Sequence, residues 1–207
     1  MENYKFSTLE YKRPDLEARR EKLAQWKESV GQAQSYEALR ALMLEIDREA
    51  CELFTQYSIA HIRHTLDTRD EFYEAEIAYL QNTLPTLSGA EVALSEAIAA
   101  SPFRPDIERE FGRQYFVAMD LQKKLYCEEN IPLRQQESRL TNEYQKIMAT
   151  AEIPFDGKTL NLYGLQKYFE HPDRAVRAAA VKAYSNFYES NEPRLEEIWD
   201  ELIRIRN

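Results

Sequence analysis

Apolar side chains recur at steps of three and four residues along most of the chain, which is the spacing of one helix face. The longest series runs through Leu39, Leu42, Met43, Ile46, Ala50, Leu53, Phe54, Tyr57, His61 and His64. Ser35 precedes this series and fits a helix N-cap. The pattern predicts a long helix that carries both histidines on the C-terminal extension of its buried face.

Capping residues and prolines divide the remaining pattern into further helices. Asp67 or Thr68 is expected to end the long helix and cap the next one, and Pro85 is expected to kink or split that next helix. Asp106 is expected to cap a helix that continues to Leu125. The chain has only 5 glycines, whereas an all-β fold needs many glycine-bearing turns. The sequence therefore predicts an all-α fold of long antiparallel helices.

One segment departs from the helical pattern. Asp156-Gly157 lies between two short β-prone runs, and this dipeptide favours a two-residue hairpin turn. We therefore expect one small β-hairpin near residues 153–161, followed by helices, the last of which is capped by Asn191. This change of character predicts two domains, a helical lobe of residues 1–150 and a segment of residues 151–207 with the hairpin and the last helices.

Charge and hydropathy argue against two classes of partner. The net charge of the chain is −9, and phosphate binding needs a basic surface, so we expect no nucleic-acid partner. No apolar run approaches the ~20 residues of a membrane-spanning helix, so we expect no membrane partner. The N-terminus is polar and lacks the apolar stretch of a signal peptide, which predicts a cytoplasmic protein.

His61 and His64 are spaced so that both imidazoles can face one metal ion. A zinc site needs a third protein ligand, and the sequence contains neither HExxH nor a glutamate three residues before a histidine. We therefore assign no catalytic and no metal-ligating residue. The imidazoles either extend the buried face and form internal hydrogen bonds, or line a cavity with Tyr57 and contact a ligand. A third hypothesis, a small metalloenzyme, would need a carboxylate from elsewhere in the fold.

A second histidine motif, His171-Pro172-Asp173, resembles the loop signature of J-domain co-chaperones. The basic helix that precedes the loop in that family is missing here. The other interpretation is a proline that ends one helix and an aspartate that caps the next.

Six short segments, in this order along the chain, resemble the N-terminal part of oligoendopeptidase F-type enzymes, in the thimet oligopeptidase family of zinc peptidases. The segments are Tyr11-Lys-Arg-Pro-Asp-Leu, Ile62-Arg-His-Thr-Leu-Asp-Thr-Arg-Asp-Glu-Phe-Tyr-Glu-Ala-Glu, Ser101-Pro-Phe-Arg, Ile153-Pro-Phe-Asp-Gly-Lys-Thr-Leu, Asp173-Arg-Ala-Val-Arg and Leu202-Ile-Arg-Ile-Arg. Together they extend over nearly the whole chain.

The resemblance implies the N-terminal lobe of a two-lobed helical peptidase that hydrolyses short peptides in a deep cavity. In that family zinc is held by an HExxH helix and a downstream glutamate, and this sequence lacks that part. We therefore expect the chain alone to be inactive and without a cofactor, with short peptides and its own catalytic part as partners. Tyr57, His61 and His64 are then candidate cavity-lining residues. The alternative is a stand-alone helical module that binds peptides or a protein without catalysis.

Overall fold

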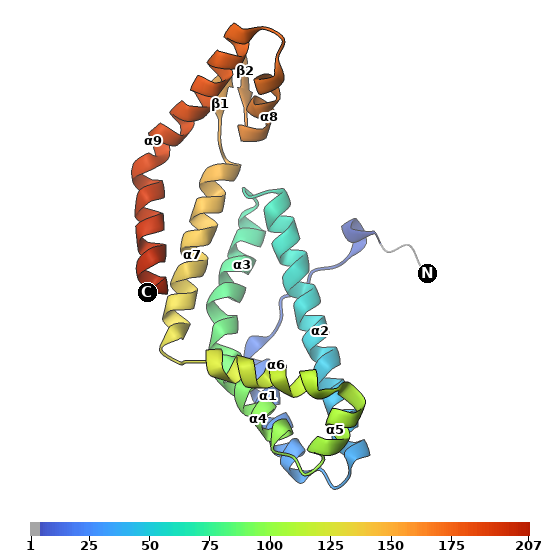
Figure 1. The fold of residues 1–207 in the computed structure, drawn as a ribbon. Helices are drawn as coiled ribbons and strands as arrows, with labels where there is room; N and C mark the ends of the chain where they lie inside the picture. The colour runs from blue at the N-terminus through green and yellow to red at the C-terminus, as the bar shows by residue number, and fades with distance from the viewer. Residues whose placement is uncertain (1–4) are drawn as a thin grey trace. The chain divides into compact units, whose positions relative to one another are not determined.

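The computed structural model describes residues 5–207, which form helices joined by short connections and one two-stranded antiparallel sheet (Figure 1). The predicted fold class, all-α with one small hairpin, is confirmed. Contacts divide the chain between Pro132 and Leu133 into two units, each of which is described by itself. The predicted domain boundary at residue 150 stays a prediction. Among the helices of residues 5–207, none combines the length and apolarity that a bilayer crossing requires.

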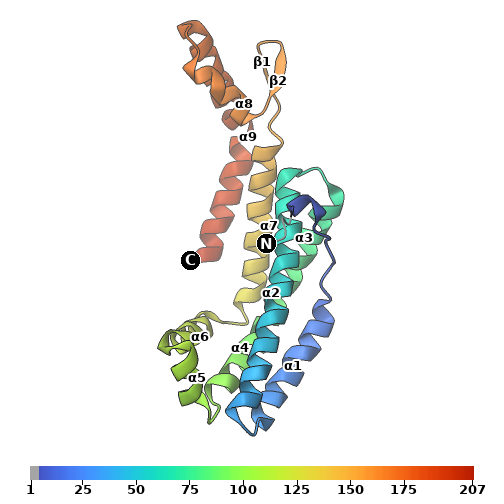
Figure 2. The same cartoon turned by 90° about the vertical axis from the view of Figure 1, so that its right-hand side faces the viewer.

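The first unit is a set of helices packed along one another. Its elements are η1 (Phe6–Thr8), α1 (Leu16–Gln32), α2 (Tyr36–Leu66), α3 (Glu71–Thr83), η2 (Leu84–Leu87), α4 (Ser88–Ala99), α5 (Arg104–Phe111) and α6 (Arg113–Leu125). Helix α1 packs against α4, and α2 packs against α3 and α1. Figure 2 shows α1 beside α4 and α2 beside α3. The short α5 and α6 then pack against each other.

The core of the first unit is formed by apolar side chains, mostly leucine and isoleucine, from η2 and from each α-helix of the unit. Its fully buried members include Leu16, Leu39, Leu80, Leu87 and Ile107. Burying a side chain of this size stabilises the fold by roughly 1.5–3 kcal/mol. The predicted buried face of α2 is correct at Leu39 and Met43 but wrong at Phe54, which is 70% exposed.

The ends of α2 and α3 show which capping predictions are right. Ser35 caps α2 as predicted, since its side chain accepts a hydrogen bond from the Ala38 amide. The cap of α3 is Asp70, whose carboxylate accepts from the Phe72 and Tyr73 amides. The break expected at Asp67 or Thr68 is confirmed, because α2 ends at Leu66 with Asp67 as its C-cap. The expectation that one of these two residues also caps the next helix is wrong.

Prolines and glycines break the later helices of the first unit. The split expected at Pro85 is confirmed, because η2 separates α3 from α4 there. The single helix expected from Asp106 to Leu125 is wrong. Gly112 adopts a φ of +82°, a backbone conformation that side chains with a Cβ rarely adopt, and it separates α5 from α6.

The second unit contains the hairpin and the two longest helices near the C-terminus. Its elements are α7 (Asn130–Ala149), β1 (Ile153–Phe155), β2 (Lys158–Leu160), α8 (Leu162–Gln166), η3 (Lys167–Glu170) and α9 (Arg174–Arg206), with the first turn of α7 on the other side of the contact boundary. Ile153 pairs with Leu160 and Phe155 with Lys158. Asp156 and Gly157 both have positive φ, as the predicted hairpin turn requires.

Helix α9 is longer than the sequence pattern predicts. Asp173 caps it by accepting from the Ala175 amide, which confirms the capping interpretation of His171-Pro172-Asp173. Asn191 was expected to cap a separate last helix, and this is wrong: its side chain donates to the Phe187 carbonyl inside α9. Pro193 also lies within α9, where it removes one backbone hydrogen bond without ending the helix.

Asp70→Ala should lower the free energy of unfolding by about 1 kcal/mol, the usual cost of losing a helix N-cap. Asp67→Ala is the matched control, because Asp67 is exposed and caps no helix start. Chemical denaturation followed by circular dichroism measures both. A larger loss in the control than in Asp70→Ala would contradict the assignment of the cap.

Candidate functional site

The three candidate cavity-lining residues lie on the last three turns of α2. Tyr57, His61 and His64 are all partly buried. The Tyr57 and His61 rings stack with centroids 5.9 Å apart and an interplanar angle of 9°. The Nδ1 atom of His61 is buried and has no hydrogen-bond partner. The internal hydrogen bond that one interpretation expects is therefore not formed at Nδ1. Leaving a buried polar atom without a partner costs free energy.

Metal binding at His61 and His64 would need further ligands. In the part of the chain that the structure describes, no group of three or more histidine, cysteine, aspartate or glutamate side chains gathers in a way that could hold an ion. The described residues therefore do not fit the zinc site of a metallopeptidase, which uses at least three protein ligands. We derive no catalytic step from this chain.

The sequence pattern does not single out Glu76, although this residue ends one of the six family-like segments. Glu76 lies on α3, and its side chain is 2% exposed. Tyr11 donates to its carboxylate at 2.6 Å, and Arg13 donates from Nε at 2.9 and 3.0 Å and also from Nη2. The segment before α1 is thus attached to α3 by a buried, charge-assisted set of hydrogen bonds.

Arg63 attaches the same N-terminal segment to the end of α2. Its guanidinium donates to the Leu9 carbonyl and to the Tyr73 hydroxyl. It also lies 5.5 Å from the Tyr73 ring centroid and 5.8 Å from that of Phe6. Arg63 is therefore the residue through which α2, α3 and the N-terminal segment meet.

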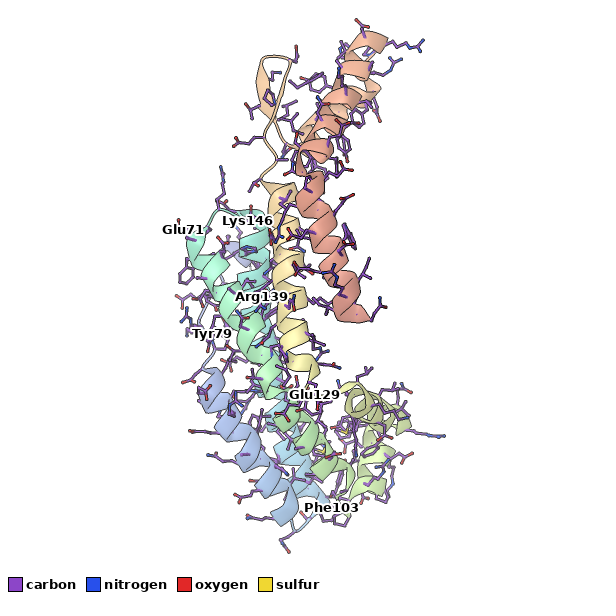
Figure 3. All side chains as sticks on the ribbon, turned by 90° about the vertical axis from the view of Figure 1, so that its left-hand side faces the viewer. Glu71, Tyr79, Phe103, Glu129, Arg139 and Lys146 are labelled. Atoms are coloured by element: carbon purple, nitrogen blue, oxygen red, sulfur yellow. The ribbon has the colours of Figure 1, made fainter. Side chains whose placement is uncertain are left out.

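Aromatic rings surround these charged groups. The Tyr11 ring meets the Phe72 and Tyr73 rings edge-on, with centroids 6.1 and 5.8 Å apart. The guanidinium carbon of Arg13 lies 4.9 Å from the ring centroid of Tyr79, which Figure 3 labels on α3. A cation over an aromatic face is stabilised by the ring quadrupole. These contacts keep the Arg13 side chain over the Glu76 carboxylate even though it is partly exposed.

Hydrogen bonding and burial shift the pKa values of Glu76 and of Tyr11 in opposite directions. Donation from Arg13, with a further contribution from Tyr11, lowers the pKa of Glu76, although burial acts in the opposite direction. Burial, together with the hydrogen bond to Glu76, raises the pKa of Tyr11 far above its usual value. At neutral pH, Glu76 is therefore ionised while Tyr11 keeps its proton and donates it.

Beside this network lies a groove of about 420 Å³ between the start of α1 and the middle of α2. Side chains of both signs line it, among them Lys12, Arg19, Lys22, Glu49 and Glu52. Lys22 and Glu49 form an ion pair at 2.8 Å. Helix α2 contributes residues up to Gln56 to this groove, one position short of Tyr57. The expectation that Tyr57, His61 and His64 line a cavity therefore stays a prediction.

The second unit has its own groove, of about 470 Å³, beside the hairpin. Its lining residues come from the end of α7, from the connection to β1, from β1 itself and from the middle of α9. They are Ile147, Thr150, Ala151, Glu152, Ile153, Pro154, Ala183, Asn186, Phe187, Ser190 and Asn191. Further along the same two helices, Arg194 of α9 donates to both oxygens of Glu143 on α7 at 2.5 Å. That bidentate pair fixes the register of the two helices.

Comparison with known proteins gives two kinds of match. A family model described as the peptidase M3 N-terminal domain matches residues 6–126. The structure of PZ peptidase A with inhibitor 2 is 34% identical with a TM-score of 0.92, and a protein assigned as oligoendopeptidase F is 35% identical with a TM-score of 0.93. Each alignment covers 98% of this chain and 36% of the other.

A further protein assigned as oligoendopeptidase F, from Bacillus anthracis str. Ames, is 31% identical with a TM-score of 0.92, over 97% of this chain and 37% of that one. The search of curated proteins gives no match. The chain thus spans little more than a third of the length of these solved proteins.

Glu76→Gln should destabilise the protein by about 2 kcal/mol at neutral pH, because Arg13 and Tyr11 then lose the ionised carboxylate that accepts their hydrogen bonds. The folded-state pKa of Glu76 is lowered, so its contribution is complete above the unfolded value of about 4.3 and is lost as pH falls through the folded-state pKa. Thermal unfolding of the wild type should therefore depend more steeply on pH below about pH 4.3 than that of the variant.

The matched control for this test is Glu71→Gln, which removes an exposed carboxylate from the first turn of the same helix. It should leave the acid limb of the stability curve close to that of the wild type. Identical pH profiles for wild type and Glu76→Gln would show that the carboxylate does not hold the N-terminal segment.

Zinc offered to the purified chain should not bind stoichiometrically, because His61 and His64 lack a third ligand among the described residues. Dialysis against zinc followed by elemental analysis measures this. If the chain binds one zinc ion and the His61→Ala, His64→Ala double variant binds none, the prediction is wrong and the metalloenzyme hypothesis is supported.

Proposed function

The chain belongs to the peptidase M3 family, and from this membership we propose that it is the N-terminal region of a zinc oligopeptidase of the oligoendopeptidase F type. The observation that carries the proposal is the alignment of 98% of the chain with solved M3 relatives at 34–35% identity and TM-scores of 0.92–0.93. The proposed reaction is hydrolysis of short peptides by the whole enzyme. The name PZ peptidase A and the assignment as oligoendopeptidase F support peptides as the substrate class.

In this proposal the chain contributes architecture and the remainder of a family-length protein contributes the chemistry. Zinc, when bound in a metallopeptidase, activates a water molecule and polarises the scissile carbonyl. The described residues of this chain hold no group that fits that ion. Their proposed role is to form a wall of the peptide cavity and so to limit the length of the peptides that enter.

We assign the cavity-facing part of this wall to the end of α2. The unpartnered Nδ1 of His61 and the partly buried Tyr57 and His64 support this assignment, because a further polar group would be needed there to complete the hydrogen bonding. Arg63, on the same turns, fixes this part of α2 to the N-terminal segment. A cytoplasmic location and the absence of a nucleic-acid partner remain part of the same proposal.

The chain alone should not hydrolyse peptides, with or without added zinc, because it lacks an HExxH helix. A fluorogenic peptide short enough for an oligopeptidase measures this, with PZ peptidase A in the same buffer as the positive control. Turnover by the chain that a chelator abolishes and zinc restores would contradict the division of roles.

A further inference from the structure

Polar contacts between α1 and α2 follow a regular series that stops at the groove between these helices. Trp26 Nε1 donates to Glu45 at 3.4 Å, and Lys22 Nζ donates to Glu49 at 2.8 Å. Each step moves four residues back along α1 and four residues forward along α2, as expected for adjacent antiparallel helices. The next turn of each helix lines the groove of about 420 Å³. Among the described residues, no hydrogen bond or ion pair joins α1 to α2 at that turn.

Three charged side chains line this part of the groove without a hydrogen-bond or ion-pair partner among residues 5–207. They are Lys12, Arg19 and Glu52. Arg19 lies one turn before Lys22 on α1. Glu52 lies one turn after Glu49 on α2, so the two opposite charges come from facing walls of the groove. Opposite charges that face each other without meeting leave room for a ligand that bridges them.

The Arg19 guanidinium lacks the acceptor that a charged donor needs. Its Nε atom is buried and has no hydrogen-bond partner. Its central carbon lies 5.3 Å from the centroid of the Trp26 ring, which supports the guanidinium at one end of the groove. Glu49 and Glu91 act on it electrostatically, but neither accepts a hydrogen bond from it. A buried donor in this state costs free energy, and an added carboxylate would remove that cost.

The other end of the groove carries an oriented amide and a second cation. Gln56 Oε1 accepts from the backbone amide of Lys12 at 2.8 Å. The Nε2 group of Gln56 and the Lys12 ammonium have no acceptor within the described part of the chain. The groove therefore offers several donors to a carboxylate or a peptide carbonyl, whereas Glu52 offers an acceptor to an ammonium group.

We propose that this groove binds a small zwitterion of the dipeptide class, with its carboxylate at Arg19 and its ammonium group at Glu52. A simple anion fits less well because Glu52 and Asp15 repel it, and a simple cation fits less well because Arg19 and Lys12 repel it. The volume of the groove lies in the range of small-molecule sites, roughly 300–1,000 Å³. The inference goes beyond the proposed peptidase function, since it follows from the charges of the groove alone.

Isothermal titration calorimetry of the full chain with three peptides tests this site. Alanyl-alanine has both charged ends, its N-acetyl derivative lacks the ammonium group, and its C-terminal amide lacks the carboxylate. We expect a Kd on the order of 1 mM for alanyl-alanine and about tenfold weaker binding of each blocked peptide. Circular dichroism during heating shows that each protein used is folded.

Two variants assign the ends of the ligand to the walls of the groove. Glu52→Gln should bind alanyl-alanine no better than the N-acetyl derivative, because the acceptor for the ammonium group is lost. Arg19→Met should bind alanyl-alanine no better than the amide, because the donor to the carboxylate is lost. The matched controls are Asp47→Asn and Lys27→Met, which change exposed charges of the same two helices outside the groove. Both should keep all three affinities within about twofold of the wild type.

Three results would overturn the site. One is a folded wild type that shows no binding of alanyl-alanine at about ten times the expected Kd. Another is equal binding of alanyl-alanine and its N-acetyl derivative by the wild type, because the groove then accepts any anion. The third is a control variant that loses as much affinity as Glu52→Gln or Arg19→Met. None of these results bears on the proposed peptidase function, which the hydrolysis assay tests separately.

Discussion

The negative charge of the buried Glu76 carboxylate must be compensated, and the arrangement of the first unit depends on how this is done. Taking an ionised carboxylate out of water is costly unless charge and hydrogen bonds replace the solvent. Arg13 and Tyr11 supply both, and both come from the segment that precedes α1. The charge on α3 therefore helps to fix the position of that segment, together with the ring contacts of Tyr11.

The same segment also joins the two helices that carry the family-like sequence. Arg63 near the end of α2 donates to the Leu9 carbonyl and to the Tyr73 hydroxyl of α3. The segment before α1 is thus bound by Glu76 on α3 and by Arg63 on α2. Tyr11, Arg63 and Glu76, which are far apart in the sequence, thus belong to one network of contacts. Their role is to position the end of α2, on which the candidate cavity residues lie.

The sequence predicts helix faces well and long-range polar partners poorly. Local chemistry was sufficient for Ser35 as a cap and for the hairpin turn at Asp156-Gly157, because those signals act within a few residues. Asn191 failed as a cap because packing on α7 carries α9 through Pro193 despite the lost hydrogen bond. In the sequence, Glu76 cannot be distinguished from a surface glutamate, because Tyr11 and Arg13, which donate to it, are more than 60 positions away.

Membership of the peptidase M3 family supports the proposal that this chain is the N-terminal scaffold of a peptidase whose chemistry belongs to another part of the protein. The buried Glu76 network and the end of α2 each have a place in that account. The most direct test of it is to read the coding sequence after the codon for Asn207. The account predicts an open frame that encodes an HExxH helix, whereas a stop codon at that point would contradict it and favour a stand-alone binding module.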